Sequence, residues 1–276
     1  MRARKRFGQH FLEPAWVAKV VKAVDAKPEE SILEIGPGRA AITRPLAEQC
    51  GRMLAVEVDR DLAAELEATK PANLTVVVGD VLEVDLAVVL SDWLGAPLGP
   101  GHSVRIVGNL PYNISSPILF ALLNLAATTG GVRDAILMLQ KEVADRLVAK
   151  VGTGDYGVLT VLTAVHADVT RVLSLPPGAF RPAPQVHSAV VRLAFRPPDV
   201  DIPDMAGFVR MVRTTFTQRR KTLSNALKPF GLERSVAPVQ ALAAAGVDGQ
   251  RRPETLNLAE MAAIFRAFHG HRLNTD

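Results

Sequence analysis

The chain has 276 residues, 48% of them hydrophobic, which is enough for one large core and a smaller second unit. The single cysteine, Cys50, excludes an intrachain disulfide and a cysteine-based zinc site, and we expect no metal centre. No apolar run is long enough to cross a bilayer and no secretory signal is evident, so we expect a cytoplasmic protein without a membrane partner. The net charge is only +4, but basic residues cluster at 2–6, 219–221 and 251–252. Each cluster alone is better interpreted as a solvated surface, whereas clusters in both end segments together raise the expectation of a polyanionic partner.

Short β-branched runs alternate with longer amphipathic stretches through the first two thirds of the chain, a rhythm typical of an α/β sheet. Strands are predicted at residues 31–35, 53–58, 74–78, 104–107, 135–140, 169–175 and 188–195. Helices are predicted at residues 14–24, 40–49, 61–68, 117–125, 142–150 and 156–164. This order predicts a Rossmann-like, mainly parallel sheet of seven strands.

A proline-rich segment at residues 196–203 ends that rhythm. The periodicity that follows is helical, with helices predicted at residues 205–217, 222–228, 238–245 and 258–268. We therefore predict two domains, an α/β domain at residues 1–197 and a small all-helical domain at residues 198–276.

The first predicted strand runs into a turn that contains Gly36 and Gly38 and then into a helix. Glycines let backbone N–H groups approach a ligand closely, and a helix N-terminus favours a negative group. Two glycines alone fit an ordinary strand–helix turn equally well. Residues at the ends of the neighbouring strands are needed to distinguish that turn from a ligand site.

Carboxylates follow the next two strands. Glu57 lies about twenty residues after the glycines, where nucleoside sites place an acceptor for ribose hydroxyls, and Val58 adjoins it; Asp59 is expected to cap the following helix. Asp80 ends the third strand and is expected to accept from the adenine amino group of a ligand, with the backbone of Val81 near the ring nitrogens. These strand ends predict a nucleoside pocket.

The fourth strand ends in Asn109, Leu110, Pro111 and Tyr112, a motif that suits methylation of a planar amine. The lone pair of adenine N6 is delocalised into the ring, so the nitrogen gains positive charge as it attacks a methyl group. Carbonyl oxygens of Asn109 and Leu110 are expected to accept its two hydrogens and to stabilise that charge.

Aromatic residues are candidates for holding the target base. Tyr112 is expected to stack on one face of the base and Phe180 on the other. Simpler interpretations are a buried aromatic under a loop for Tyr112 and an apolar plug in a proline-rich loop for Phe180.

Six motifs together resemble the KsgA family of small-subunit ribosomal RNA adenine dimethyltransferases; they lie at residues 6–12, 34–38, 57–59, 79–80, 109–115 and 180–186. The resemblance implies a Rossmann-like methyltransferase domain, a helical RNA-binding domain and S-adenosylmethionine as cofactor. It further implies N6,N6-dimethylation of two adjacent adenines in the 3′-terminal hairpin loop of 16S rRNA. The implied partner is rRNA within an immature 30S-type subunit during ribosome biogenesis, with no obligate protein partner.

The same resemblance assigns individual residues. Gln9, His10 and Leu12 would border the methionine end of the cofactor, with Gly36 and Gly38 beside its carboxylate. The basic clusters themselves, rather than the resemblance, predict RNA phosphate contacts, and a solvated helix end is a nearly equal alternative for the second cluster; the residues are Arg4, Lys5, Arg6, Arg219, Arg220 and Lys221. The chain departs from the family pattern at Ala40, where a third glycine is common.

Two alternatives stay open at this stage. One is an erythromycin-resistance type of methyltransferase that acts on large-subunit rRNA and shares the strand-end motifs. The other is an assembly factor or checkpoint protein that binds immature subunits and in which methylation is secondary.

Overall fold

The computed structural model describes residues 10–270, and the chain divides into two compact units. The first unit comprises Met1–Ala144 and Ala167–Arg196, and the second comprises Asp145–His166 and Pro197–Asp276. From Pro197 onward, in the proline-rich segment, the chain belongs to the second unit. Residues 145–166 also belong to this unit, although the sequence analysis placed them in the α/β domain.

The first unit is built on a seven-stranded sheet of order β4-β3-β2-β5-β6-β9-β7. Its strands are β2 (Ser31–Ile35), β3 (Arg52–Glu57), β4 (Leu74–Val78), β5 (Val104–Asn109), β6 (Val132–Gln140), β7 (Ala167–Leu175) and β9 (Ser188–Phe195). The strands from β4 to β6 are parallel, and β9 pairs antiparallel with both β6 and β7. The predicted mainly parallel sheet is confirmed.

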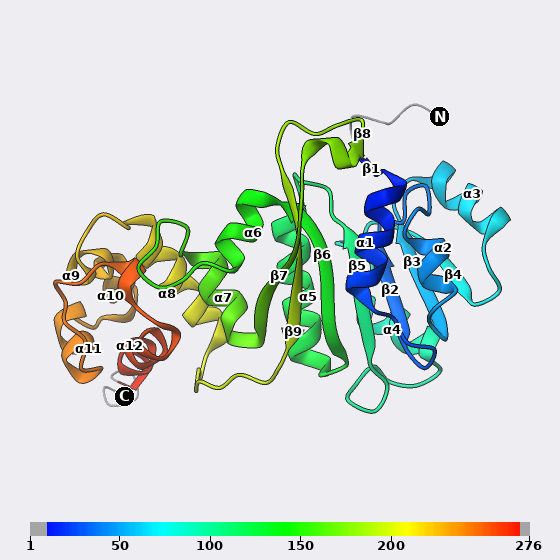
Figure 1. The fold of residues 1–276 in the computed structure, drawn as a ribbon. Coiled ribbons are helices and arrows are strands. Elements are labelled where there is room, and N and C mark those ends of the chain that lie inside the picture. Colours follow the sequence, from blue (N-terminus) through cyan, green and yellow to red (C-terminus); the bar gives the residue numbers. More distant parts are fainter. Residues whose placement is uncertain (1–9, 271–276) are drawn as a thin grey trace. The chain divides into compact units, whose positions relative to one another are not determined.

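Helices flank this sheet, with α1 and α5 on opposite faces (Figure 1). They are α1 (Pro14–Val24), α2 (Thr43–Ala47), α3 (Arg60–Thr69), α4 (Leu86–Leu94) and α5 (Ser115–Thr129). Helix α4 was not predicted; its start is fixed by Asp85, whose side chain accepts from the N–H groups of Ala87 and Val88. It ends at Gly95, which adopts φ 72°.

The position of the functional site follows from the strand order. The chain runs outward from β2 to β3 and β4, and then returns to place β5 on the other side of β2. Open α/β sheets bind ligands at such a reversal, beyond the carboxyl ends of the strands. The glycine turn follows β2 and Asn109 ends β5, so both lie at this point.

A second, two-stranded sheet was not predicted. It pairs β1 (Phe11–Leu12) with β8 (Phe180–Arg181) in antiparallel fashion, and a 3₁₀ turn at Pro177–Ala179 precedes β8. The register sets Leu12 opposite Phe180. This pairing fixes residues near the N-terminus beside a loop from the far end of the sheet.

The second unit is helical and has an aromatic core. Besides α7 (Val158–His166) it contains α8 (Met205–Thr217), α9 (Leu223–Ala226), α10 (Lys228–Arg234), α11 (Pro238–Ala244) and α12 (Leu258–Gly270), and α6 (Lys141–Leu147) leads into it. Phe208 packs edge-on against Phe265, and Phe230 edge-on against Phe268. No helix within residues 10–270 is long and apolar enough to span a membrane.

Candidate active site

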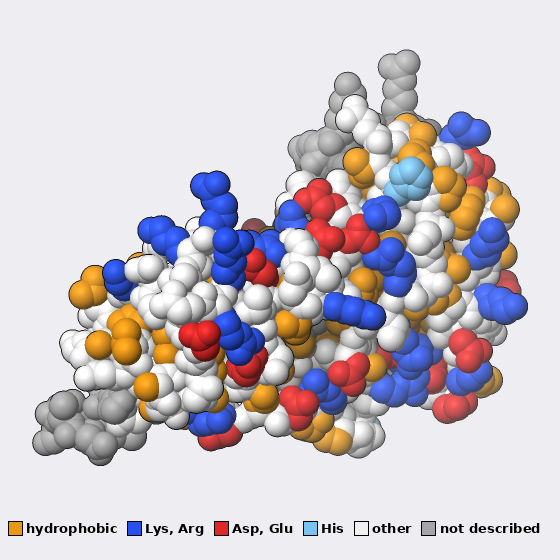
Figure 2. All heavy atoms as spheres, turned by 60° about the vertical axis from the view of Figure 1, so that its left-hand side comes forward, with side chains coloured by type: hydrophobic (Ala, Val, Ile, Leu, Met, Phe, Trp, Pro, Cys, Tyr) orange, Lys and Arg blue, Asp and Glu red, His pale blue; other side chains and the backbone are white. Residues whose placement is uncertain are grey.

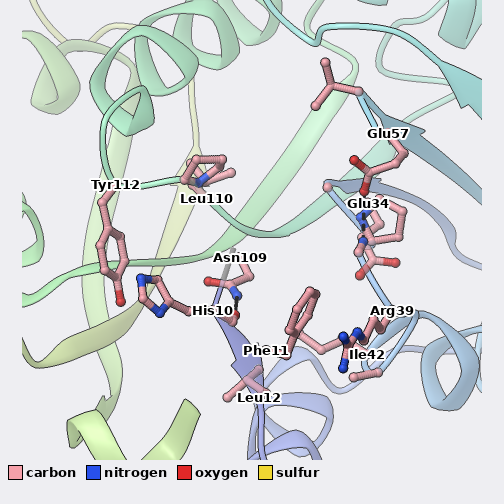
Figure 3. A pocket seen from close by; sticks show the side chains of 16 residues that line it. His10, Phe11, Leu12, Glu34, Arg39, Ile42, Glu57, Asn109, Leu110 and Tyr112 are labelled. Carbon is pink, nitrogen blue, oxygen red and sulfur yellow. Dashed lines mark hydrogen bonds between the residues drawn. The ribbon is translucent and has the colours of Figure 1, made fainter. Parts of the chain in front are cut away.

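A pocket opens at the carboxyl ends of β2, β3 and β5 (Figure 3). Its lining combines backbone turns, two carboxylates, an amide and aromatic rings: His10, Phe11, Leu12, Glu34, Gly36, Pro37, Gly38, Arg39, Ala41, Ile42, Glu57, Val58, Asn109, Leu110, Pro111 and Tyr112. Most residues that the sequence analysis assigned to cofactor or target base therefore lie around one cavity.

The turn after β2 is a left-handed backbone segment. Gly36, Gly38 and Ala40 adopt φ values of 67°, 57° and 60°. The Gly36 N–H group donates to the Val56 carbonyl at 2.9 Å, which ties the turn to β3. Glycine adopts positive φ without penalty, whereas Ala40 carries a methyl group in the same conformation.

Glu57 joins this turn to the end of β3. Its Oε2 accepts from the Gly38 N–H group and its Oε1 from the Asp59 N–H group, both at 2.9 Å. Each carboxylate oxygen keeps a lone pair for a further donor. Asp59 caps α3 as predicted, because its side chain accepts from the Asp61 N–H group.

Asp80 and Val81 lie just beyond β4, at the same edge of the sheet but outside the pocket lining. The register that pairs Glu57 with Val78 brings the end of β4 beside the end of β3. Asp80 Oδ1 accepts from the Leu82 N–H group at 2.9 Å. The two residues thus border the region next to Glu57.

Asn109 is oriented by the backbone of His10. Its Nδ2 donates to the His10 carbonyl at 3.0 Å, which leaves Oδ1 as the amide atom available to accept hydrogen bonds in the pocket. Leu110 is held in the adjoining turn because its N–H group donates to the Met138 carbonyl. The end of β5 and the turn after it are therefore held by two backbone carbonyls, one near the N-terminus and one on β6.

Tyr112 is half-buried and held at both ends. Its hydroxyl lies 2.7 Å from the Ser188 hydroxyl, and its ring stacks on His10 with centroids 5.5 Å apart and planes inclined by 23°. Burial raises the pKa of Tyr112, although the Ser188 hydroxyl opposes that rise, so the phenol is neutral at physiological pH. His10 Nδ1 is 2.8 Å from the Pro182 carbonyl, which fixes the imidazole.

Phe180 is not brought into the pocket. It is fully buried within a hydrophobic cluster that includes Leu12 and Val190, and it does not appear in the pocket lining. In this structure the ring that faces Tyr112 is that of His10. The geometry at this position matches the simpler interpretation of Phe180 as an apolar plug.

Glu34, Phe11 and Arg39 line the pocket although the sequence analysis assigned them no role. Arg39 lies over the Phe11 ring at 4.3 Å from its centroid. Burial raises the pKa of Glu34 to about 7, with a smaller opposing effect of Thr43 and a smaller additional effect of the Glu57 charge. A carboxyl inside an otherwise apolar strand was the available signal for Glu34.

A basic cluster, defined here as Arg219, Arg220 and Lys221, lies in the second unit at the end of α8 and borders a shallow depression with Thr217 and Gln218. Figure 2 shows Lys and Arg side chains gathered on the surface of this helical unit, at the left of the view. Arg219 donates to the carbonyls of Gly154 and Thr153 at 2.6 and 2.9 Å. Of the other predicted contacts, Arg4, Lys5, Arg6 and Gln9 lie outside the described residues.

Two relatives of similar sequence share one description. A relative from Aromatoleum aromaticum, described as "Ribosomal RNA small subunit methyltransferase A", is 46% identical over 95% of this chain and 93% of its own length. A relative of the same description from Geobacter metallireducens is 44% identical over 97% and 96%.

Solved structures share the fold. A dimethyladenosine transferase from Plasmodium falciparum superposes with a TM-score of 0.75 at 22% identity, covering 95% of this chain and 98% of that one. The 23S rRNA methyltransferase ErmE gives 0.64 at 25% identity, covering 94% and 99%. The family model described as "Ribosomal RNA adenine dimethylase" matches residues 1–269, and the chain belongs to that family.

Proposed function

We propose that this protein transfers methyl groups from S-adenosylmethionine to the N6 amine of adenine in small-subunit rRNA. The observation that carries the proposal is the orientation of Asn109: its Nδ2 is engaged by the His10 carbonyl, and its Oδ1 is left to accept from a substrate amine. Membership in the adenine dimethylase family and relatives described as small-subunit methyltransferases support the same substrate.

The chemistry follows from that acceptor. The Asn109 amide oxygen and the Leu110 carbonyl would accept the two N–H hydrogens of the amine and draw its lone pair out of conjugation. Positive charge that develops on the nitrogen is then stabilised by fixed dipoles, commonly by about 3 kcal/mol for each well-placed group. No general base is required, because the product ammonium is acidic enough to lose its proton to water.

The pocket residues fit the methyl donor. Gly36 has open space beside its Cα for the amino-acid end of the donor, and Gly38 lies two residues further along the same turn. Glu57 has lone pairs for ribose hydroxyls, and Asp80 with Val81 borders the proposed place for its adenine. When bound, S-adenosylmethionine supplies an electrophilic methyl group. Glu34 adds a buried oxygen without a donor, which is the kind of atom that a cationic ligand satisfies.

Tyr112 is our candidate for stacking on the target base, because it lines the pocket and its hydroxyl is held by Ser188. His10 already occupies a stacked position on that ring. Phe180 would form the second wall, as its motif implies, only after leaving the hydrophobic cluster in which it is buried. We therefore propose Tyr112 as the principal stacking residue.

The substrate assignment has finer parts that belong to the same proposal. They are dimethylation of two adjacent adenines in the 3′-terminal hairpin loop, action on an immature 30S-type subunit in the cytoplasm, and phosphate contacts by the helical unit. The basic cluster supports the last part, because phosphate contacts position nucleic acid without reading its sequence. Arg220 and Lys221 are the exposed members of that cluster.

Mass spectrometry of rRNA fragments tests substrate, position and methylation count together. Purified protein and labelled S-adenosylmethionine are incubated with immature small subunits, with mature small subunits and with naked large-subunit rRNA. We expect two dimethylated adenines in one 3′-terminal fragment of the immature subunit. Modification of large-subunit rRNA alone would replace the proposal by the erythromycin-resistance type of activity.

A matched binding assay separates catalysis from assembly. An Asn109→Ala variant is expected to bind immature subunits as the parent does while transferring no methyl group. Loss of binding and transfer together would contradict the assignment of Asn109 to the chemical step.

A further inference from the structure

The His10 imidazole covers one face of the Tyr112 ring inside the pocket. The two rings stack with centroids 5.5 Å apart and planes inclined by 23°, and both residues line the cavity. Figure 3 shows the His10 ring between Tyr112 and Asn109. A base that stacked on Tyr112 with its amine at Asn109 would therefore need the space that the imidazole fills.

The Tyr112 ring is held in place by the sheet. Its hydroxyl lies 2.7 Å from the Ser188 hydroxyl, and Ser188 is only 1% exposed. Ser188 begins β9, where it pairs with Gln140 of β6 and Leu175 of β7. A ring tied to three strands in this way does not move aside easily, so an incoming base has to displace the other ring of the pair.

The backbone of His10 is fixed as well, which leaves the imidazole as the part that can turn. The His10 carbonyl accepts from Asn109 Nδ2 at 3.0 Å, and Phe11 pairs with Arg181 in the small sheet. Among the described residues the imidazole makes a single hydrogen bond, at an exposed site, from Nδ1 to the Pro182 carbonyl at 2.8 Å. Rotation to another staggered side-chain conformation breaks that bond and the stack and leaves the backbone in place.

We propose that the His10 imidazole occupies the place of the target base on Tyr112 while no base is bound, and that the entering base displaces it. This role rests on the proposed function, in which Tyr112 stacks on the target base. Displacement exchanges one ring on Tyr112 for another, so stacking alone adds little net affinity. The base is then retained by the hydrogen bonds of its amine to the Asn109 amide oxygen and the Leu110 carbonyl.

The sign of one effect separates this role from a direct contact between His10 and the base. A ring that competes with the base weakens base binding, so its removal should strengthen binding by about two- to tenfold, the factor that corresponds to one aromatic pair. A ring that contacts the base would produce the opposite change when removed. Because the competition acts through Tyr112, it should vanish when Tyr112 is replaced.

Nuclear magnetic resonance of the full chain with labelled histidine side chains follows the displacement. The probes are adenosine, which carries the target amine, and inosine, which has a carbonyl in its place; both are added after S-adenosylhomocysteine has filled the donor site. The His10 signals are those missing from His10→Ala. Before a nucleoside is added they should carry a ring-current shift that Tyr112→Leu abolishes, and saturating adenosine should abolish it too.

The same titrations give the affinities. His10→Ala should bind adenosine and inosine about two- to tenfold more tightly than the parent, by the same factor for both, because the imidazole competes with any base on Tyr112. His102→Ala removes an exposed histidine that does not line the pocket and should bind as the parent does. Tyr112→Leu should weaken binding of both nucleosides, and His10→Ala should have no further effect in that background.

The outcomes separate the role of His10 from the proposed function. Weaker adenosine binding by His10→Ala, or a His10 shift that persists when adenosine is bound, overturns the displacement of His10 and leaves the proposed function in place. A shift that S-adenosylhomocysteine alone removes also overturns it. No binding of S-adenosylhomocysteine overturns the proposed function itself, and binding of it without either nucleoside overturns the target-base site together with the role of His10. Should His10→Ala fail to fold, His10→Asn identifies the signals and the shift in the parent decides.

Discussion

Buried carboxyl groups at the two ends of β2 have pKa values shifted in opposite directions. At the amino end, Glu30 pairs with Arg105 at 2.9 Å and with Arg133, and Arg105 also pairs with Asp134 at 2.7 Å. Although burial opposes ionisation of Glu30, hydrogen bonds from the two arginines lower its pKa. At the carboxyl end, burial raises the pKa of Glu34, whose Oε2 has no partner among the described residues.

Buried carboxyls at the amino end of β2 are paired within the protein, whereas the buried carboxyl at the carboxyl end keeps an oxygen that a ligand could satisfy. Asp134 is fully buried, yet arginine groups satisfy it on both oxygens. Buried charges persist in proteins when they are paired in this way. The carboxyl end instead holds an uncompensated carboxyl and a left-handed turn, features that cluster at functional sites.

The largest effect on stability is expected in the ion-pair network at the amino end of β2. Replacing Asp134 by Ala leaves Arg105 buried without its main partner, so the free energy of unfolding should fall by about 3–5 kcal/mol. Urea denaturation measures this change, with Asp168→Ala as control because Asp168 is 70% exposed in its pair with Arg196. The control should cost about 0–1 kcal/mol. Equal costs for both variants would refute the contrast between a structural network and a surface pair.

The next largest effect is expected on the rate of methyl transfer, at Asn109, which ends β5 beside the carboxyl end of β2. Asn109→Ala removes the oriented amide oxygen, and kcat should fall by about 10²–10³-fold if, as we propose, that oxygen stabilises charge that develops in the transition state. Single-turnover methylation of immature subunits measures it. Asn124→Ala, at an exposed position of α5, is the matched control. A kcat close to that of the parent would remove Asn109 from the chemical step.

A third prediction concerns how the free energy of unfolding depends on pH through Glu34 and Glu30. The raised pKa of Glu34 means that the ligand-free fold loses stability as pH rises from about 4.5, the ordinary value, to about 7. Glu34→Gln cannot ionise, so at pH 8 it should be more stable than the parent by about 3 kcal/mol, and similar to it at pH 5. The lowered pKa of Glu30 works in the other direction: its contribution is present above the ordinary value and is lost as pH falls through its folded-state pKa.

Denaturation curves of both proteins at several pH values test this prediction. Glu48→Gln, at an exposed carboxyl, is the control, and it should follow the parent at each pH. A Glu34→Gln variant whose stability runs parallel to that of the parent between pH 5 and 8 would show that the carboxyl is not held protonated.

Local pattern was sufficient for much of the sheet. The strands at residues 31–35, 74–78 and 188–195 were predicted with the bounds that the structure has, because each is a compact β-branched run between turn residues. The motif at residues 109–112 and the glycine turn were predicted at strand ends, and the parallel order then brings them to one edge of the sheet.

The small sheet and the burial of Phe180 were not predicted, because they depend on contacts between distant segments. A two-residue strand has no periodicity, so the pairing of Phe11–Leu12 with Phe180–Arg181 was not predicted, and with it the burial of Phe180. The helix expected at residues 40–49 begins only at Thr43, because Ala40 adopts the left-handed conformation that the turn requires. Helix propensity favours alanine in a helix, and the tertiary turn overrides it.

The smallest effect concerns that turn. Ala40 is 5% exposed with φ 60°, so it carries strain at the open end of β2 where glycine would carry none. Ala40→Gly should therefore raise the free energy of unfolding by about 0.5–1 kcal/mol, the relief of strain exceeding the added freedom of the unfolded chain. Ala63→Gly in the buried face of α3 is the control and should lower it by about 1 kcal/mol. If both variants are destabilised alike, the turn after β2 stores no strain, and the contrast between the two ends of the strand reduces to charge alone.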